Sequence, residues 1–179
     1  MISSSISTPV WSKVTSGTIA SGGSIMTITI PANYQGWKRY RITLTLKTAH
    51  NDVDLINLNF NGDSGVASYA WTELSATGAV AQSTIDLSDS RIRLAYVGHD
   101  QFDTATLTIS QPTTTQYKSV MFFGGPCENT TATNGYIAMV SGKWLNNANA
   151  ISSIALTAVN AAGNKLAEFS NYMVEGNND

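Results

Sequence analysis

Apolar and polar residues alternate with a period of two along most of this sequence. Within residues 26–30, Met26, Ile28 and Ile30 alternate with threonines, and residues 41–47 repeat the pattern. Successive side chains of a β-strand point to opposite faces of its sheet, so this period predicts strands with one buried and one exposed face. Apolar residues at helical spacing are almost absent, and the sequence therefore predicts an all-β protein.

Further alternating runs follow at short intervals, separated by turn-forming residues. The expected strands are 56–60, 69–74, 80–87, 92–97, 105–109, 120–123, 136–140, 151–159 and 166–174. About eleven short strands at this spacing are typical of an antiparallel β-sandwich, and we expect a jelly-roll-like form. The 179 residues suffice for one domain with a substantial core. We assign this domain to residues 24–179, after an extended, Ser-rich N-terminal arm, residues 1–23, that docks on a partner or on the sandwich.

Charged residues make up 12% of the chain, about half of the roughly 25% that an ordinary globular domain carries. The formal net charge is −2, and the only cationic cluster consists of Lys38, Arg39, Arg41 and Lys47. Nucleic-acid binding relies on a basic surface, so we expect no nucleic-acid partner. Residues 1–8 lack the pattern of a signal peptide and no stretch is apolar enough to span a membrane, so we expect a soluble protein made in the cytoplasm.

Residues with catalytic or metal-binding chemistry are few, and their spacing does not suit such chemistry. Cys127 is the single cysteine, which excludes an internal disulfide and favours a small buried side chain. His50 and His99 fit no zinc motif, and no phosphate-binding glycine motif occurs. We therefore expect no cofactor, no metal and no enzymatic activity. Two alternatives stay open: a calcium site assembled from distant loops, and a carboxylate pair like that of glycoside hydrolases.

Residues 62–65, Gly-Asp-Ser-Gly, match part of the nucleophile motif of trypsin-like serine proteases, and His50 precedes them. That family places an entire β-barrel between the two elements, so the short separation here makes the match a chance one. We predict instead a hairpin turn, in which Gly62 and Gly65 adopt positive φ and Asp63 accepts a hydrogen bond from a nearby backbone N–H.

Five aromatic residues allow two interpretations. Packing between the sheets is favoured, because Trp and Tyr bury a large area while keeping a polar group. An exposed platform on which sugars stack is the alternative. The residues concerned are Tyr69, Trp71, Tyr96, Tyr136 and Trp144.

Two other tryptophans lie outside the alternating runs. Trp11 and Trp37 stand in or beside loop-like segments, where an aromatic side chain is a candidate for contact with another chain. Val10 and Val14 accompany Trp11 in the N-terminal arm. We predict that these four residues form an interface that anchors the domain to a particle or to sister subunits.

Three segments of the sequence carry recognisable motifs: an Ile-Pro plus Tyr segment before a basic strand, an F-N-G-D element followed by a Tyr, and an Ile-x-x-Ile-x-Leu strand near the end. In these motifs the sequence resembles a widespread group of virion proteins of tailed bacteriophages. Roughly two-thirds of the chain is covered, although 169–176, FSNYMVEG, departs from the Gly-Ser and Leu-Tyr-Gly sequence that many members carry. The matching positions are Ile30, Pro31 and Tyr34; Phe60, Asn61, Gly62, Asp63 and Tyr69; and Ile151, Ile154 and Leu156.

The resemblance implies a jelly-roll-like capsid decoration protein, head-fibre protein or tail-associated protein, often a homotrimer. We therefore expect a virion structural protein, assembled in the host cytoplasm, whose partners are phage capsid or tail proteins. It would bind the particle and stabilise it, or mediate surface contact. The alternative is a carbohydrate-binding, lectin-like module, including a receptor-binding domain of a phage tail that binds a host-surface glycan. A hydrolase on the same scaffold is a third alternative, because a fold alone does not determine a function.

Overall fold

A computed structural model gives the fold of the chain and describes most of its length. The described residues are 10–19, 22–49, 54–78, 80–98, 102–111, 116–125, 136–159 and 166–178. They form twelve β-strands and one short 3₁₀ helix, η1 (Ala32–Tyr34). No helix among them is long and apolar enough to cross a membrane.

The strands build two antiparallel sheets. The larger sheet has eight strands in the order β1 (Ser12–Thr18), β12 (Asn171–Asn177), β3 (Arg39–Leu46), β8 (Asp103–Ser110), β9 (Lys118–Gly124), β10 (Tyr136–Trp144), β5 (Tyr69–Thr77) and β6 (Val80–Asp89). The smaller sheet has four, in the order β2 (Ile25–Thr29), β11 (Ser153–Ala158), β4 (Asp54–Phe60) and β7 (Ile92–Val97). Many neighbours are distant in sequence, as in the Greek-key sandwiches to which jelly rolls belong.

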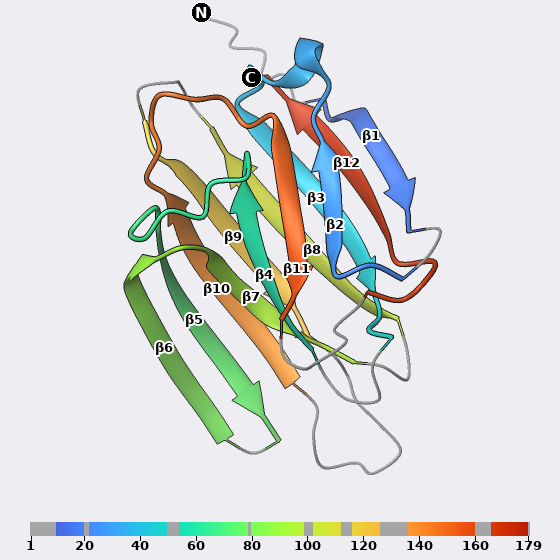
Figure 1. Ribbon diagram of the computed structural model, residues 1–179, viewed down its shortest axis with the longest axis vertical. Helices are drawn as coiled ribbons and strands as arrows, with labels where there is room; N and C mark the ends of the chain where they lie inside the picture. Colours follow the sequence, from blue (N-terminus) through green and yellow to red (C-terminus); the bar gives the residue numbers. More distant parts are fainter. Residues whose placement is uncertain are drawn as a thin grey trace, which may run out of the picture.

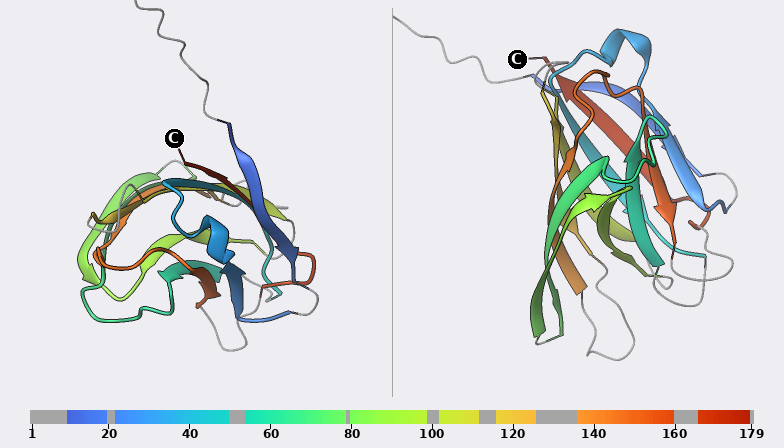
Figure 2. Two further views of the ribbon diagram at one scale, coloured as in Figure 1. Left: turned by 90° about the horizontal axis from the view of Figure 1, so that it is seen from above. Right: turned by 60° about the vertical axis from the view of Figure 1, so that its left-hand side comes forward.

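The two sheets face each other and enclose a single apolar core. Figure 1 shows the smaller sheet in front of the larger one, and the view from above in Figure 2 shows the larger sheet arching over it. The strands alternate as predicted: in β3, Tyr40, Ile42 and Leu44 are fully buried while the intervening side chains are not. This arrangement confirms the predicted antiparallel β-sandwich.

The described part of the predicted N-terminal arm belongs to the larger sheet. Residues 12–18 form the edge strand β1, which pairs with β12 along its length apart from one irregularity between Lys13 and Thr15. Of the two dockings considered for the arm, the structure places this part on the sandwich. Residues 1–9 lie outside the described part of the chain.

The last predicted strand, 166–174, was placed too early in the sequence. Leu166 forms only isolated bridges, to Gly23 and Thr48, and Phe169 has a φ of 66°. A non-glycine residue in this left-handed region interrupts an extended strand. The regular strand β12 therefore begins after it, at Asn171.

Strand β6 extends beyond the smaller sheet. It is bonded to β5 alone, and none of its ten residues is buried. Figure 1 shows the β5–β6 pair projecting along one side of the molecule, with β6 at the free edge. The larger sheet therefore presents an open edge and two accessible faces at this end.

Candidate functional site

An apolar patch occupies the face of the larger sheet that is turned away from the smaller one. We call this the outer face. Its side chains alternate with core residues, so the burial of Val120, Phe122, Ala138 and Val140 sends their strand neighbours outward. Six large apolar side chains, each 47–62% exposed, form what we call the outer patch: Leu74, Ile85, Met121, Phe123, Ile137 and Met139.

Strand register brings the members of the outer patch together. Met139 lies directly opposite Phe123 of β9 and Leu74 of β5. Residues facing each other across antiparallel strands have Cβ atoms about 5 Å apart, so these side chains form one continuous surface. Two shallow apolar hollows flank Leu74 and Met139, one reaching Met121 and the other reaching Ile137.

The surroundings of the outer patch are polar and almost uncharged. Across β8, β9, β10, β5 and β6, Lys143 is the only charged side chain on the outer face among the described residues. Outside the register shift at the end of β6, the other outward residues are small: Ala70, Thr72, Ala76, Ala81, Ser83, Thr104, Thr106, Thr108, Ser110, Ser119 and Ser141. An apolar centre without charges, inside a polar rim, is the usual anatomy of a protein–protein interface.

Isolated exposed apolar residues are common, but a contiguous patch on a monomer is often functional. This patch was not predicted from the sequence. The signal was present, because 120–123 and 136–140 are apolar at both phases of the alternation. Such strands have both faces in apolar surroundings, or one apolar face without a partner in the same chain.

A second cluster of polar and aromatic side chains lies where β7, the edge of the smaller sheet, meets β5 and β10. Arg93 Nε lies 3.3 Å from Glu73 Oε2, and Arg93 Nη2 donates a hydrogen bond of 3.1 Å to Tyr96 Oη. Tyr136 donates a short hydrogen bond to Glu73 Oε1. The rings of Tyr96 and Tyr136 meet edge to face, with centroids 5.2 Å apart. We call these four residues the edge cluster.

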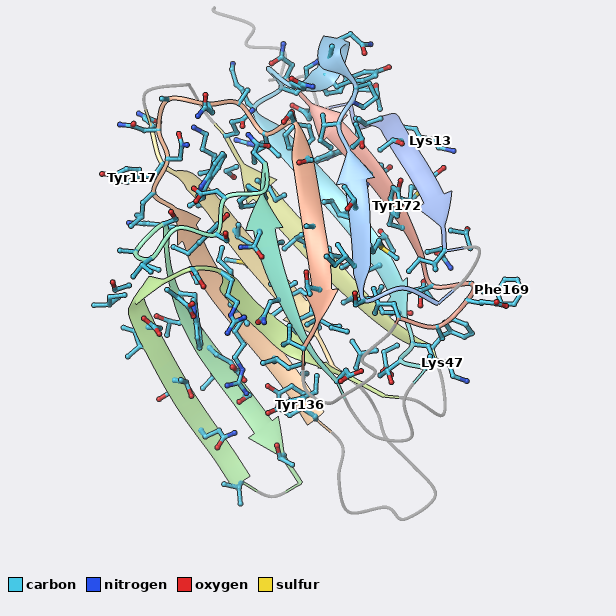
Figure 3. The ribbon with its side chains drawn as sticks, viewed as in Figure 1. Lys13, Lys47, Tyr117, Tyr136, Phe169 and Tyr172 are labelled. Atoms are coloured by element: carbon cyan, nitrogen blue, oxygen red, sulfur yellow. The ribbon has the colours of Figure 1, made fainter. Side chains whose placement is uncertain are left out.

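The side chains of the edge cluster differ in their exposure to solvent and in their charge. The Glu73 side chain is 2% exposed, whereas the Arg93 side chain is 27% exposed. Burial, followed by the hydrogen bond to Glu73, raises the pKa of Tyr136 far above its ordinary value. Tyr136 therefore stays a neutral donor to Glu73 at any physiological pH. Figure 3 shows Tyr136 at the end of β10 where that strand begins, close to the rim of the sandwich.

The five aromatic residues for which the sequence allowed two interpretations fall into two groups in the structure. Tyr69, Trp71 and Trp144 are buried in the core, and Phe60 packs against Tyr69 and Trp144 with ring centroids 6.4 and 5.4 Å apart. The packing interpretation is confirmed for these three. Tyr96 and Tyr136 are partly exposed in the edge cluster.

The Gly-Asp-Ser-Gly segment is a structural corner, and its predicted hydrogen bond is confirmed. Asp63 Oδ1 accepts hydrogen bonds from Gly65 N at 3.0 Å and Ser68 Oγ at 2.8 Å, and Asp63 Oδ2 accepts one from Trp144 Nε1 at 2.7 Å. Burial raises the pKa of the Asp63 carboxyl, but these three bonds outweigh it and hold that pKa below its usual value.

Two details of that predicted turn were wrong. The segment joins β4 of the smaller sheet to β5 of the larger one, so it is a connection between sheets and not a hairpin. Gly62 has the predicted positive φ, 70°, but the other positive φ belongs to Asn61, 53°, and not to Gly65. The tight turn therefore spans Phe60 to Asp63 and is closed by a hydrogen bond of 2.8 Å from Asp63 N to Phe60 O.

The predicted interface residues lie around the β1 edge of the larger sheet. Val10 is 75% exposed, Val14 is buried in the core, and Trp11 stacks on the Arg41 guanidinium with 4.9 Å from its centre to the ring. Trp37 packs edge to face on Tyr34 at 4.8 Å. Val14, Trp11 and Trp37 thus all contact other residues of this chain, and the outer patch lies on other strands.

The remaining candidate residues, Cys127, His50 and His99, lie outside the described residues. Within the described ranges, no group of three or more His, Cys, Asp or Glu side chains could hold a metal ion.

Comparisons with known proteins place few constraints on this chain. No family model matches the sequence, and no curated protein does. Solved structures similar to it include the carbohydrate-binding module CBM40 of the Ruminococcus gnavus IT-sialidase bound to α2,3-sialyllactose, with 10% identity, 91% of each chain covered and a TM-score of 0.36. A second structure of the Ruminococcus gnavus IT-sialidase CBM40 has 11% identity, covers 91% of this chain and 92% of its own, and has a TM-score of 0.35. A likeness of this size carries no argument about what this chain binds.

Proposed function

We propose that this chain is a non-catalytic structural protein on the surface of a bacteriophage particle, and that it docks on another particle protein through the outer patch. The observation that carries the docking is the outer patch itself, an exposed apolar centre inside an uncharged polar rim. Burying such a surface against protein releases water from apolar side chains, at about 25 cal/mol for each Å². The low charge of the chain favours close packing over electrostatic attraction.

The motif residues that resemble those of virion proteins support the proposal, because their hydrogen bonds hold the fold together. The Asn61 side chain donates to Ala150 O at 2.8 Å and accepts from Ser152 N at 2.8 Å. Tyr69 Oη accepts from Phe60 N and donates to Asp63 O, each at 2.9 Å. These residues tie β4, β5 and the segment before β11 together, so the resemblance rests on residues that determine the fold.

The docking is tested with particles of the encoding phage, assembled without this protein. Wild-type protein should co-sediment with these particles, and Met139→Glu should lower retention at least about tenfold, because a carboxylate would be buried in an apolar contact. Thr104→Glu, on the outer face but outside the outer patch, should bind normally. Normal binding by Met139→Glu, with both variants folded by circular dichroism, would remove the outer patch from the mechanism.

A second candidate function, glycan binding, is favoured by the edge cluster. Sugars bind to partly exposed aromatic rings beside fixed hydrogen-bonding groups, and Tyr96 and Tyr136 stand beside Arg93 in this way. An ion pair with Glu73 and the hydrogen bond from Nη2 to Tyr96 hold the Arg93 guanidinium in place, while part of its side chain stays exposed.

Glycan binding is tested on an array of bacterial surface glycans. If the edge cluster is the site, binding should fall at least about tenfold in Tyr96→Ala, because an aromatic stacking contact worth about 0.5–1.5 kcal/mol is lost together with the hydrogen bond that positions Arg93. Tyr117→Ala, an exposed tyrosine at the opposite end of the sandwich, is the matched control (Figure 3). If the wild type binds no glycan on the array, glycan binding is rejected and particle docking is the one remaining candidate function.

A further inference from the structure

The two sheets have four edge strands, and three of them carry features that discourage pairing with another strand. Edge strand β1 has an irregular register and the charged Lys13, β2 has only five residues, and β7 has a register shift against β4 and the charged Arg93. Charges, bulges and short length are the usual ways in which proteins prevent edge-to-edge association. Each of these edges is therefore protected.

The fourth edge strand, β6, lacks this protection over most of its length. Residues 80–85, Val-Ala-Gln-Ser-Thr-Ile, contain no charge and no proline. The register shift against β5 falls only at the far end, near Asp86 and Asp89. Val80 and Ile85 are 64% and 62% exposed. Strand β6 is bonded only to β5 and buries none of its side chains, so it gains little from packing within one chain and its free edge can accept another strand.

We infer that β6 pairs antiparallel with β6 of a second copy of this chain, about a two-fold axis near Ser83, to join two larger sheets edge to edge. This interface is independent of the particle-docking role proposed above. A two-fold axis perpendicular to the sheet keeps the outer faces of both copies on the same side. With Ser83 on the axis, each residue faces the one at the same distance on the other side of Ser83, so Ile85 lies opposite Ala81 of the second copy.

The charges of the strand suit this pairing. On the inner face Gln82 lies opposite Thr84, and Asp86 lies opposite Val80 of the second copy. The two Asp86 carboxylates are then about 20 Å apart along the strands, beyond the Debye length of about 10 Å at 0.1 M salt. On the outer face, Ile85 beside Ala81 extends each outer patch toward the axis.

Symmetry explains why the partner is a second β6. A closed two-fold contact satisfies both unprotected edges at once and leaves no further edge of this kind. Pairing of β6 with any other edge of the sandwich would leave one β6 open and propagate into filaments, and those other edges are protected. The expected assembly is therefore a dimer, in contrast to the trimer that the resemblance implies.

Light scattering after size exclusion tests the pairing over a range of chain concentrations. The wild type should show a mass of about 38 kDa, twice the 19.1 kDa of one chain. Ser83→Lys places two ammonium groups against each other at the axis and should lower self-association at least tenfold. Ser83 is exposed, so the substituted chain should keep its fold, checked by circular dichroism. Ser119→Lys, exposed on β9, is the matched control and should remain dimeric.

Charge complementation makes the test specific for this edge. Ser83→Asp should also be monomeric, and an equal mixture with Ser83→Lys should recover the dimer mass, because opposite charges then meet at the axis. A wild type that is monomeric or trimeric throughout, or a Ser83→Lys protein that remains dimeric, overturns the inference. Neither result bears on retention by phage particles, so failure of the dimer and failure of particle docking are distinguishable.

Discussion

The Asp63 carboxylate accepts three hydrogen bonds, and one of them comes from the indole of Trp144, a fully buried core residue. A short loop between the sheets is thereby joined to the end of β10 in the larger sheet. The spacing of glycines and acids predicted a local bond at this position. It could not predict the bond to Trp144, because 81 residues separate the two partners and only the completed fold brings them together.

Asp63→Asn should lower the free energy of unfolding at neutral pH by about 1–3 kcal/mol, because bonds to a charged acceptor become bonds to a neutral one. The pKa of Asp63 is lowered in the folded state, so its contribution is present above the ordinary Asp pKa of about 3.9 and is lost as pH falls through the folded value. The deficit of the variant should therefore shrink in acid.

Urea unfolding at a series of pH values measures this difference. Glu168→Gln, which changes an exposed carboxylate, is the control and should track the wild type at every pH. A deficit for Asp63→Asn that stays constant from neutral pH to below pH 3 would mean that the Asp63 charge contributes nothing to stability.

At the scale of strands, alternation predicted the elements but not their neighbours. The strands β9, β10 and β5 were each expected from their own sequences, yet the outer patch exists only because β10 lies between the other two. The contact of Met139 with Leu74 links residues far apart in the sequence. Period-two patterns assign side chains to faces and contain no information about which strands pair.

The same reason explains why the turn after β4 was misassigned. A Gly-rich segment between two expected strands favours a hairpin, because sequential strands most often pair. Here β4 pairs with β7 and β11, whereas β5 pairs with β6 and β10. The direction of the chain after Asn61 is set by the Tyr69 hydroxyl, which bonds to both sides of the turn.

Uncharged groups make up most of the contacts within the whole molecule and most of the outer face of the larger sheet. Only 12% of residues are charged, and of the ion pairs among the described residues only Arg93–Glu73 is largely buried. Exposed pairs such as Arg41–Glu175 contribute at most about 1 kcal/mol. Screening by salt should therefore have little effect on the stability of the fold or on binding through the outer patch.

Raising the ionic strength from about 0.01 M to about 1 M shortens the Debye length from about 30 Å to about 3 Å. Across this range we expect the Tm of the protein to change by no more than about 3 °C, the equivalent of roughly 1 kcal/mol for a chain of this size. Retention by phage particles should change less than about threefold, because apolar contacts are not screened by salt. Differential scanning calorimetry and co-sedimentation at matched salt concentrations provide the two measurements. Binding that falls steeply with salt while the Tm stays constant would show that charged groups, and not the outer patch, hold the protein on the particle.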